Sequence, residues 1–184
     1  LDRVLAKDIY PKRDNPPNDN SAMDGYAVRY DDVRQISDGR AATLDVIEDI
    51  PAGIIPQKKV NSGEASRIMT GAPIPSGADT IIPVEDTKNI GNQLIEIIRI
   101  EESGAHIRRR GEDINVGQPV LHAGQILTAG ELSVLATLQI SFVPVFRKAR
   151  VAIITTGDEL IEIEESPNPG QIVNSNNISH AVFC

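Results

Sequence analysis

Short strand-like segments fill the middle of the chain, and this pattern limits the fold more than any other feature. They cover residues 42–47, 65–70, 80–84 and 93–100, and clusters of Gly and Pro separate them. Their branched side chains pack well on a pleated surface. Forty per cent of all residues are hydrophobic but only 3% are aromatic, so Ile, Val, Leu and Ala must supply the core. The pattern predicts an all-β module over about residues 31–102.

The sequence patterns before and after this module indicate a second, smaller unit formed by both flanking segments. Residues 1–10 have the pattern of a short helix or turn and are too few to form a unit alone. Thr128 followed by Glu131 is a capping box, and the apolar residues after it share one helical face. This predicts a helix over residues 129–138. We expect the two segments to pack together, which makes the β module an insertion between them.

The last segment has the pattern of an α/β domain. Residues 151–154 are an unbroken apolar run, which suits a strand buried on both faces of a parallel sheet. A doubly wound domain needs more strands than the remaining residues supply, so we expect only its truncated start. The predicted fold is multidomain α+β: a small mixed first domain, a β-rich second domain inserted into it, and the start of an α/β third domain. The predicted domains are residues 1–10 plus 118–148, residues 11–117 and residues 149–184.

The net charge and the single cysteine narrow the class of protein. A formal net charge of −8 argues against general binding to nucleic acid. The one basic run, Arg108, Arg109 and Arg110, suits a single anionic contact, although a solvated loop explains it as well. Cys184 is the only cysteine, so no internal disulfide is expected. No apolar run approaches the roughly 20 residues that cross a membrane, and we expect a cytoplasmic protein without membrane contact.

Two pairs of neighbouring residues are candidates for binding or catalysis. Asp24 stands directly before Gly25 in a region that we expect to be irregular, but Asp-Gly is also a common hairpin turn. Thr70 and Gly71 stand at the end of a predicted strand and could offer a hydroxyl and a backbone N–H to an anion. Thr70 could equally cap its own backbone. The residues alone leave both alternatives open.

Two further candidates carry carboxylates beside other ligand-binding signals. Asp113 follows the arginine run and Glu112, so this segment could hold a phosphate through arginine and a metal through Asp113. A surface ion-pair cluster is the alternative. Glu159 follows the apolar run near the carboxyl end of the predicted parallel strand, where α/β domains bind ligands, and an acidic helix start is the alternative. The three histidines lack metal-ligand spacing, and no Gly-rich phosphate loop or serine-hydrolase elbow is present.

Taken in order along the chain, these motifs resemble those of the molybdopterin molybdenumtransferases. The matching segments are residues 14–17, 21–27, 69–73, 77–80, 84–87, 111–113, 130–137 and 155–160. They are spread over nearly the whole chain, and so many motifs in one order are highly specific. The resemblance implies an elongated homodimer with four domains per subunit, of which this chain holds the first, the second and the start of the third.

The resemblance also implies an activity. Adenylylated molybdopterin and molybdate are the substrates, AMP is released, and the dithiolene takes up molybdenum with Mg²⁺ as the assisting cation. Bare carboxylates would repel these anions, so charge balance calls for the cation. The implied residues are Asp24, Thr70, Asp113 and Glu159 for catalysis, Asp113 and Glu159 for the metal, and Gly71, Thr156, Gly157, Asp158, Ser175 and Asn176 for the substrate. The family's site lies where the second domain of one subunit meets the third domain of its partner.

Departures from the family pattern lead to further expectations. Asn18 stands where members usually carry an aromatic residue, and Asn174 replaces a usual aspartate near the expected pterin-phosphate site. The family's later motifs lie beyond Cys184, so these 184 residues alone are expected to be inactive. The resemblance also leads us to expect contact with the molybdopterin adenylyltransferase and later cofactor-maturation proteins. The main alternative is a non-catalytic interaction module, because gephyrin uses the same architecture as a scaffold.

Overall fold

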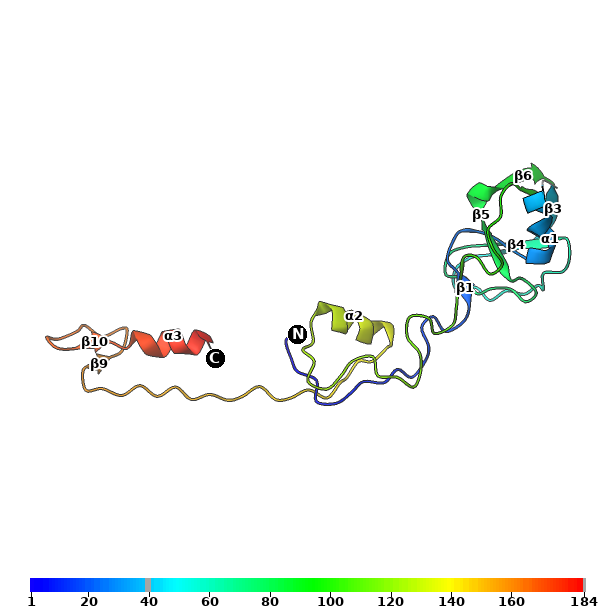
Figure 1. Cartoon of the computed structure of the whole chain (residues 1–184). Helices are drawn as coiled ribbons and strands as arrows, with labels where there is room; N and C mark the ends of the chain where they lie inside the picture. The colour runs from blue at the N-terminus through cyan, green and yellow to red at the C-terminus, as the bar shows by residue number, and fades with distance from the viewer. Residues whose placement is uncertain (39–40, 184) are drawn as a thin grey trace. The chain divides into compact units, whose positions relative to one another are not determined.

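The computed structural model describes residues 1–38 and 41–183, which divide into two compact units, Leu1–Pro144 and Val145–Cys184 (Figure 1). The elements in chain order are β1 (Asn20–Ser21), β2 (Gly25–Val28), α1 (Tyr30–Val33), η1 (Arg34–Asp38), β3 (Ala42–Ile50), β4 (Glu64–Ile68), β5 (Thr80–Pro83), η2 (Val84–Asp86), β6 (Thr87–Gly91), β7 (Leu94–Ile97), β8 (Ile107–Arg108), α2 (Ala129–Thr137), β9 (Leu160–Ile161), β10 (Ile172–Val173) and α3 (Ser175–Phe183). Among the described residues, none of these helices is both long and apolar enough to cross a membrane.

A six-stranded mixed sheet forms the centre of the first unit. Its strand order is β5-β2-β4-β3-β7-β6, and only the β3–β4 pair is parallel. Four of the strands, β3, β4, β5 and β7, lie where the sequence predicts strands, with ends that differ by a few residues. The α+β fold class is confirmed. The module is not all-β, however, because α1, η1 and η2 interrupt it.

The strand β2 corrects the prediction that the segment around Asp24 is irregular. Asp24 itself lies in a bend, but the chain enters the sheet at the next residue. Tyr26 and Val28 belong to the hydrophobic core on one face of the sheet, whereas Ala27 belongs to the core on the other face. Since both faces of β2 are buried, its sequence shows no alternation of polar and apolar residues, and periodicity could not reveal it.

The chain enters the sheet so tightly at β2 that only glycine fits its first position. A Cβ atom at Gly25 would lie 2.1 Å from the carbonyl oxygen of Ile82 on the neighbouring strand β5. The obstacle is backbone of a paired strand, which cannot rotate away as a side chain would. Asp24, directly before Gly25, is therefore held against the end of the sheet.

The first ten residues form two bridges with bends between them and no helix, so of the predicted short helix or turn the helix is wrong. Val4 forms an antiparallel bridge with Ile126, and Ile9 forms one with Leu121. This pairing satisfies backbone groups across the chain, which a helix of two or three turns would not do. Residues 1–10 therefore do pair with the segment beyond the β module. The boundaries of the three predicted domains stay a prediction.

The helix α2 is confirmed, and its start has the predicted capping residues. The carboxylate of Glu131 accepts a hydrogen bond from the backbone N–H of Thr128 at 2.8 Å and another from the Thr128 hydroxyl. Leu135, within this helix, is buried. A local sequence signal was sufficient here because the cap and the apolar face lie within one short segment.

The second unit contains the parallel pair β9–β10 and the helix α3. The segment after residue 174 is helical, but the predicted strand at residues 151–154 is wrong. This segment is extended without ladder pairing, and the Ile154 side chain is 83% exposed. A central strand needs neighbours on both edges, and no described residue of this unit pairs with it. The α/β third domain therefore stays a prediction.

Candidate functional site

Asp24 and Thr70 lie 46 residues apart in sequence and form a direct contact in the structure. One carboxylate oxygen of Asp24, Oδ1, accepts hydrogen bonds from the backbone N–H and from the hydroxyl of Thr70, both at 2.7 Å. Both residues are exposed to solvent. The sequence left open whether Thr70 caps its own backbone. Its hydroxyl instead binds the Asp24 carboxylate, so the two candidate residues form one site.

The turn that carries Thr70 is fixed by a second chain segment. The backbone N–H of Ser21 donates to the carbonyl of Ala72 at 3.0 Å, and the N–H of Gly71 donates to the carbonyl of Ser21 at 2.8 Å. Gly71 has a φ of +83°, a conformation that glycine adopts without strain. Ser21 is fully buried. These bonds place the N–H of Thr70 at the carboxylate of Asp24.

The pKa of Asp24 is lowered from its ordinary value of 3.8. The main cause is the hydrogen bond from the backbone N–H of Thr70, followed by the bond from its hydroxyl and by the attraction of the Arg67 guanidinium. The side chain is therefore a carboxylate at neutral pH. It can attract a cation or orient a hydroxyl, but it has no proton to donate.

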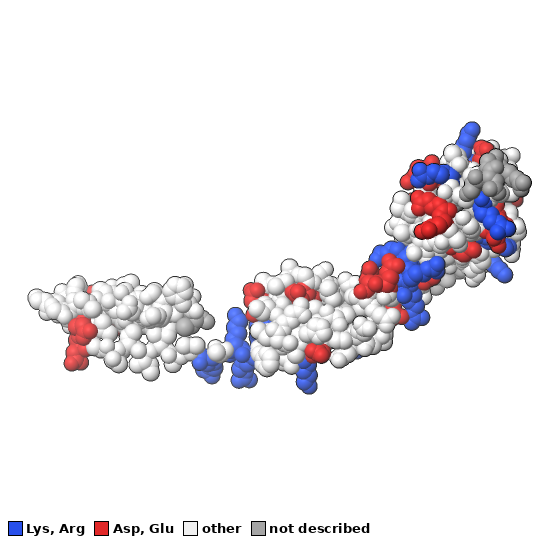
Figure 2. All heavy atoms as spheres, in the orientation of Figure 1, with Lys and Arg blue, Asp and Glu red and all other residues white. Residues whose placement is uncertain are grey.

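The predicted residue Asp113 lies in a cluster of ion pairs, which we call the crossover cluster. The cluster joins two segments, residues 14–20 and residues 107–114, that run side by side: β1 pairs with β8, and Asn15 forms a bridge with Ile114. Its members are Asp14, Asp19, Arg108, Arg109, Arg110, Glu112 and Asp113. Figure 2 shows basic and acidic side chains intermixed beside the segment that carries β1 in Figure 1.

Each arginine of the cluster has a carboxylate partner. Arg108 contacts Glu112 at 2.9 Å and Asp113 at 2.6 Å. The other pairs are Arg109–Asp19 at 2.7 Å and Arg110–Asp14 at 2.6 Å. The arginine run is therefore an ion-pair cluster, as the second of our two sequence interpretations proposed. An anion that binds there must compete with these carboxylates.

Lowering the pH is expected to weaken the ion pairs of the crossover cluster and so to destabilise the protein. The pKa of Asp14 is lowered from 3.8, first by the backbone N–H of Val116 and then by Arg110. A group whose pKa is lower in the folded than in the unfolded protein stabilises the fold fully at any pH above its unfolded-state pKa. This stabilisation is lost as the pH falls through the folded-state pKa. The melting temperature should therefore fall below about pH 4. Asp14→Asn should melt lower at pH 7 and lose less on acidification, as scanning calorimetry would measure.

Asp31→Asn is the matched control for this experiment. Asp31 is exposed and lies 3.6 Å from Arg34 in a surface pair, which contributes little to stability. We expect its melting temperature to follow the wild type from pH 7 to pH 2. The same acid dependence in Asp14→Asn as in the wild type would contradict the role of the cluster.

Four predicted site residues of the second unit line one cavity of about 380 Å³. They are Thr156, Glu159, Ser175 and Asn176. Gly157 and Asp158 belong to the turn before β9 and do not line this cavity: the N–H of Leu160 donates to the carbonyl of Gly157 at 3.1 Å. The cavity is rich in hydroxyl, amide and carboxylate oxygens, which suits a polar ligand or a hard cation.

Asn174, which departs from the family pattern, has a defined contact. Its side-chain N–H₂ group donates to the hydroxyl oxygen of Thr155 at 2.7 Å. An aspartate at this position could only accept a hydrogen bond from the same hydroxyl. The departure therefore reverses the direction of one hydrogen bond beside the cavity and removes one negative charge.

The residues fit a magnesium ion only if a ligand supplies part of its coordination. Across residues 1–38 and 41–183, no three His, Cys, Asp or Glu side chains group so as to hold a metal. Mg²⁺ in proteins is often held by one or two carboxylates with water and substrate phosphates. Asp113 and Glu159 each offer a carboxylate, but they belong to different units. Asp113 Oδ2 already accepts from Arg108 at 2.6 Å.

Several residues of these sites were missed by sequence reasoning. They include Ser21, which fixes the turn, Asp14 and Asp19, which pair with arginines, and Arg67, which attracts Asp24. Arg67 had a usable signal, since it is the cation of the short strand Glu64–Ile68 and stands three residues before Thr70. Asp14 and Asp19 had no usable signal, because pairing with arginines 90 to 96 residues away has no local sequence pattern.

The sheet, its Asp24–Thr70 pair and the pairing of residues 1–10 with residues 121–126 across the inserted module define a class of protein. Residues 1–138 match the family model described as MoeA N-terminal region (domain I and II). The chain belongs to this family, as the sequence motifs predicted.

The relatives that this chain resembles carry a consistent name. It is 41% identical over 181 residues to a molybdopterin molybdenumtransferase of Nostoc sp., covering 98% of this chain and 41% of that protein. It is 44% identical over 175 residues to molybdopterin molybdenumtransferase 2 of Mycobacterium tuberculosis, covering 95% and 43%. The crystal structure of a molybdopterin biosynthesis moeA protein from Pyrococcus horikoshii superposes with a TM-score of 0.92 at 39% identity, covering all of this chain and 48% of that one. The chain thus spans less than half of the proteins it matches.

Proposed function

We propose that the protein containing this chain inserts molybdenum into molybdopterin. Adenylylated molybdopterin and molybdate are the substrates, and AMP leaves as molybdenum joins the dithiolene. The observation that carries the proposal is the contact between Asp24 and Thr70, two motif residues that meet at 2.7 Å on the surface of the sheet. The name of the relatives supports the same role in molybdenum cofactor biosynthesis.

The residues of this chain take separate roles in the proposed reaction. The lowered pKa of Asp24 favours a positioning or cation-binding role over proton donation. Because the Thr70 hydroxyl donates to Asp24, an oxygen lone pair of Thr70 stays available to a substrate donor. The N–H of Gly71 donates to Ser21, so its part is to shape the turn. Glu159 and its neighbours in the second unit bind the substrate or the metal.

A magnesium ion is part of this proposal. When bound, it would neutralise charge on the phosphoanhydride that breaks. Asp113 and Glu159 are the residues that we propose to hold it. Arg108 orients the carboxylate of Asp113 by a contact of 2.6 Å and keeps Glu112 beside it.

The remaining expectations concern the assembly. We propose a homodimer with the site shared between subunits, a cytoplasmic location, and contacts with the molybdopterin adenylyltransferase and later cofactor-maturation proteins. Residues 1–184 alone should not turn over, because they span only 41% of the Nostoc relative. A non-catalytic scaffold is the second candidate, and the acidic and hydroxyl residues of the Asp24–Thr70 pair favour the enzyme over it.

An assay of AMP release tests this function. The full-length protein, incubated with adenylylated molybdopterin, Mg²⁺ and molybdate, should release AMP in a molybdate-dependent manner. Asp113→Ala should reduce the rate about tenfold or more, a moderate effect because Glu112 remains beside the vacated position. Equal release by wild type and variant, or none by either, would refute the enzymatic role. Light scattering on the same sample measures the dimer.

A further inference from the structure

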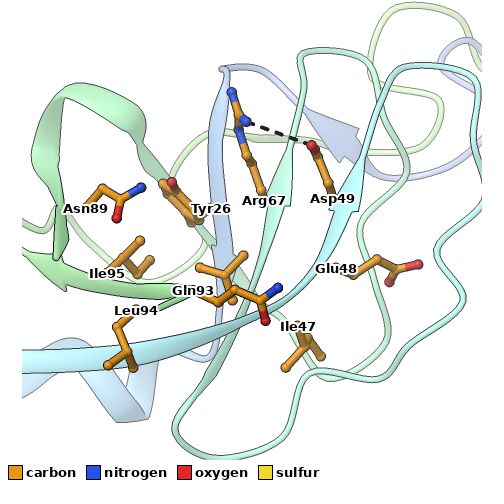
Figure 3. A pocket seen from close by; sticks show the side chains of 10 residues that line it. Tyr26, Ile47, Glu48, Asp49, Arg67, Asn89, Gln93, Leu94 and Ile95 are labelled. Carbon is orange, nitrogen blue, oxygen red and sulfur yellow. Dashed lines mark ion pairs between the residues drawn. The ribbon is translucent and has the colours of Figure 1, made fainter. Parts of the chain in front are cut away.

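A cavity of about 410 Å³ opens on the sheet, and the proposed function gives it no role (Figure 3). Its polar lining residues are Tyr26, Glu48, Asp49, Arg67, Asn89 and Gln93, and the others are apolar. The Glu48 carboxylate already accepts hydrogen bonds from the backbone N–H groups of Gln57 and Lys58. The cavity lies where β3 changes register against β4, between Val46 and Glu48. A bulge of this kind re-aims side chains and often accompanies functional sites.

Arg67 links this cavity to the Asp24–Thr70 pair. Tyr26, two residues after Asp24, is the register partner of Arg67 in the β2–β4 ladder. The guanidinium is close enough to Asp24 to stabilise its carboxylate. Arg67 also precedes Thr70 by three residues at the end of β4. The cavity therefore adjoins the proposed site through one cationic side chain.

The donors of Arg67 are available to a ligand. Its Nη1 atom lies 3.8 Å from Asp49 Oδ2, which is too long for a hydrogen bond. The crossover arginines, in contrast, contact their carboxylates at 2.6 to 2.9 Å. The side chain of Arg67 is 49% exposed, and it makes no hydrogen bond to any residue in the described part of the chain.

We propose that Arg67 binds a tetrahedral oxyanion of the substrates beside Asp24. The ligand is either the phosphate group of the adenylylated substrate or molybdate, and this identity rests on the proposed function. A guanidinium presents its N–H groups as a planar fork that matches two oxygens of such an anion. Asp49 competes for the same guanidinium in the free protein (Figure 3). The bound oxyanion replaces Asp49 as the partner of Arg67.

Replacing either partner of the Arg67–Asp49 ion pair shows whether Arg67 binds an anionic ligand or only forms a structural ion pair. Isothermal titration calorimetry on the full-length protein measures the Kd of AMP, inorganic phosphate and molybdate separately. Arg67→Gln should raise the Kd of the bound anion about tenfold or more. Asp49→Asn should lower the same Kd about two- to fivefold, because it removes a competing surface partner. Arg34→Gln, which changes the net charge equally at an exposed pair, should leave all three values unchanged.

The outcomes decide both the proposal and the source of the anion. Weaker AMP and phosphate binding in Arg67→Gln identifies the phosphate group, and weaker molybdate binding alone identifies molybdate. Three unchanged Kd values, equal weakening by Arg67→Gln and Asp49→Asn, or no binding to the wild type at millimolar concentration overturns the proposal. AMP release tests the proposed function independently: an active protein whose anion binding ignores Arg67 refutes only this inference. A protein without turnover that still loses anion binding in Arg67→Gln refutes only the function.

Discussion

Replacing Gly25 with alanine is expected to destabilise the β module by about 3 kcal/mol or more, which is the upper range for overpacked positions. The added Cβ would lie 2.1 Å from the backbone oxygen of Ile82, so β2 and β5 must separate to admit it. Since β2 lies between β5 and β4, the damage should reach the whole sheet. Urea denaturation followed by circular dichroism measures the loss.

Gly130 provides a control with the opposite expected sign. It lies in α2, and the nearest atom to an added Cβ would be the Thr128 hydroxyl oxygen at 3.8 Å, an ordinary contact. Gly130→Ala should therefore stabilise the protein by about 0.5–1 kcal/mol, since alanine favours a helix. A Gly25→Ala variant as stable as the wild type would show that β5 does not approach β2 this closely.

Asp24→Asn is expected to reduce the turnover of the full-length protein by about 10²–10³-fold, within the range of catalytic side-chain effects. Asparagine keeps the Oδ1 acceptor, so both hydrogen bonds from Thr70 can form, and only the charge is lost. The melting temperature should stay near that of the wild type. AMP release measures the rate, and calorimetry measures the stability.

Substitutions of Thr70 separate the hydroxyl from the backbone in this site. Thr70→Ser keeps both bonds to Asp24 and should stay within about threefold of the wild-type rate, whereas Thr70→Val removes one bond and should lose more than tenfold. If Asp24→Asn retained full turnover while Asp113→Ala did not, the carboxylate of Asp24 would have no part in the chemistry.

Local patterns predicted the parts of the fold whose signals lie within one segment. The helix α2 has its cap and apolar face within about ten residues, and the branched run at β7 needs no distant partner to be recognised. The strand β2 was missed because it is buried on both faces. Residues 151–154 were assigned to a strand wrongly, because an apolar run does not say whether neighbouring strands are present.

The candidate site was predictable only as a set of separate motifs. Asp24 and Thr70 each had a plausible local alternative, and only the fold shows that they share two hydrogen bonds. The arginine run illustrates the same limit, since its partners Asp14 and Asp19 lie more than 85 residues away. Whether Asp113 and Glu159 act with Asp24 stays a prediction.

The antiparallel bridge between Asn15 and Ile114 means that the chain leaves the β module where it entered. Partners in such a bridge have Cα atoms only about 5 Å apart. A gene could therefore gain or lose the intervening segment with little disturbance to the flanking polypeptide, which needs only a short loop to close the junction. In this respect the module is a separable insertion, and a change in the length of its loops need not disturb the fold of the residues on either side.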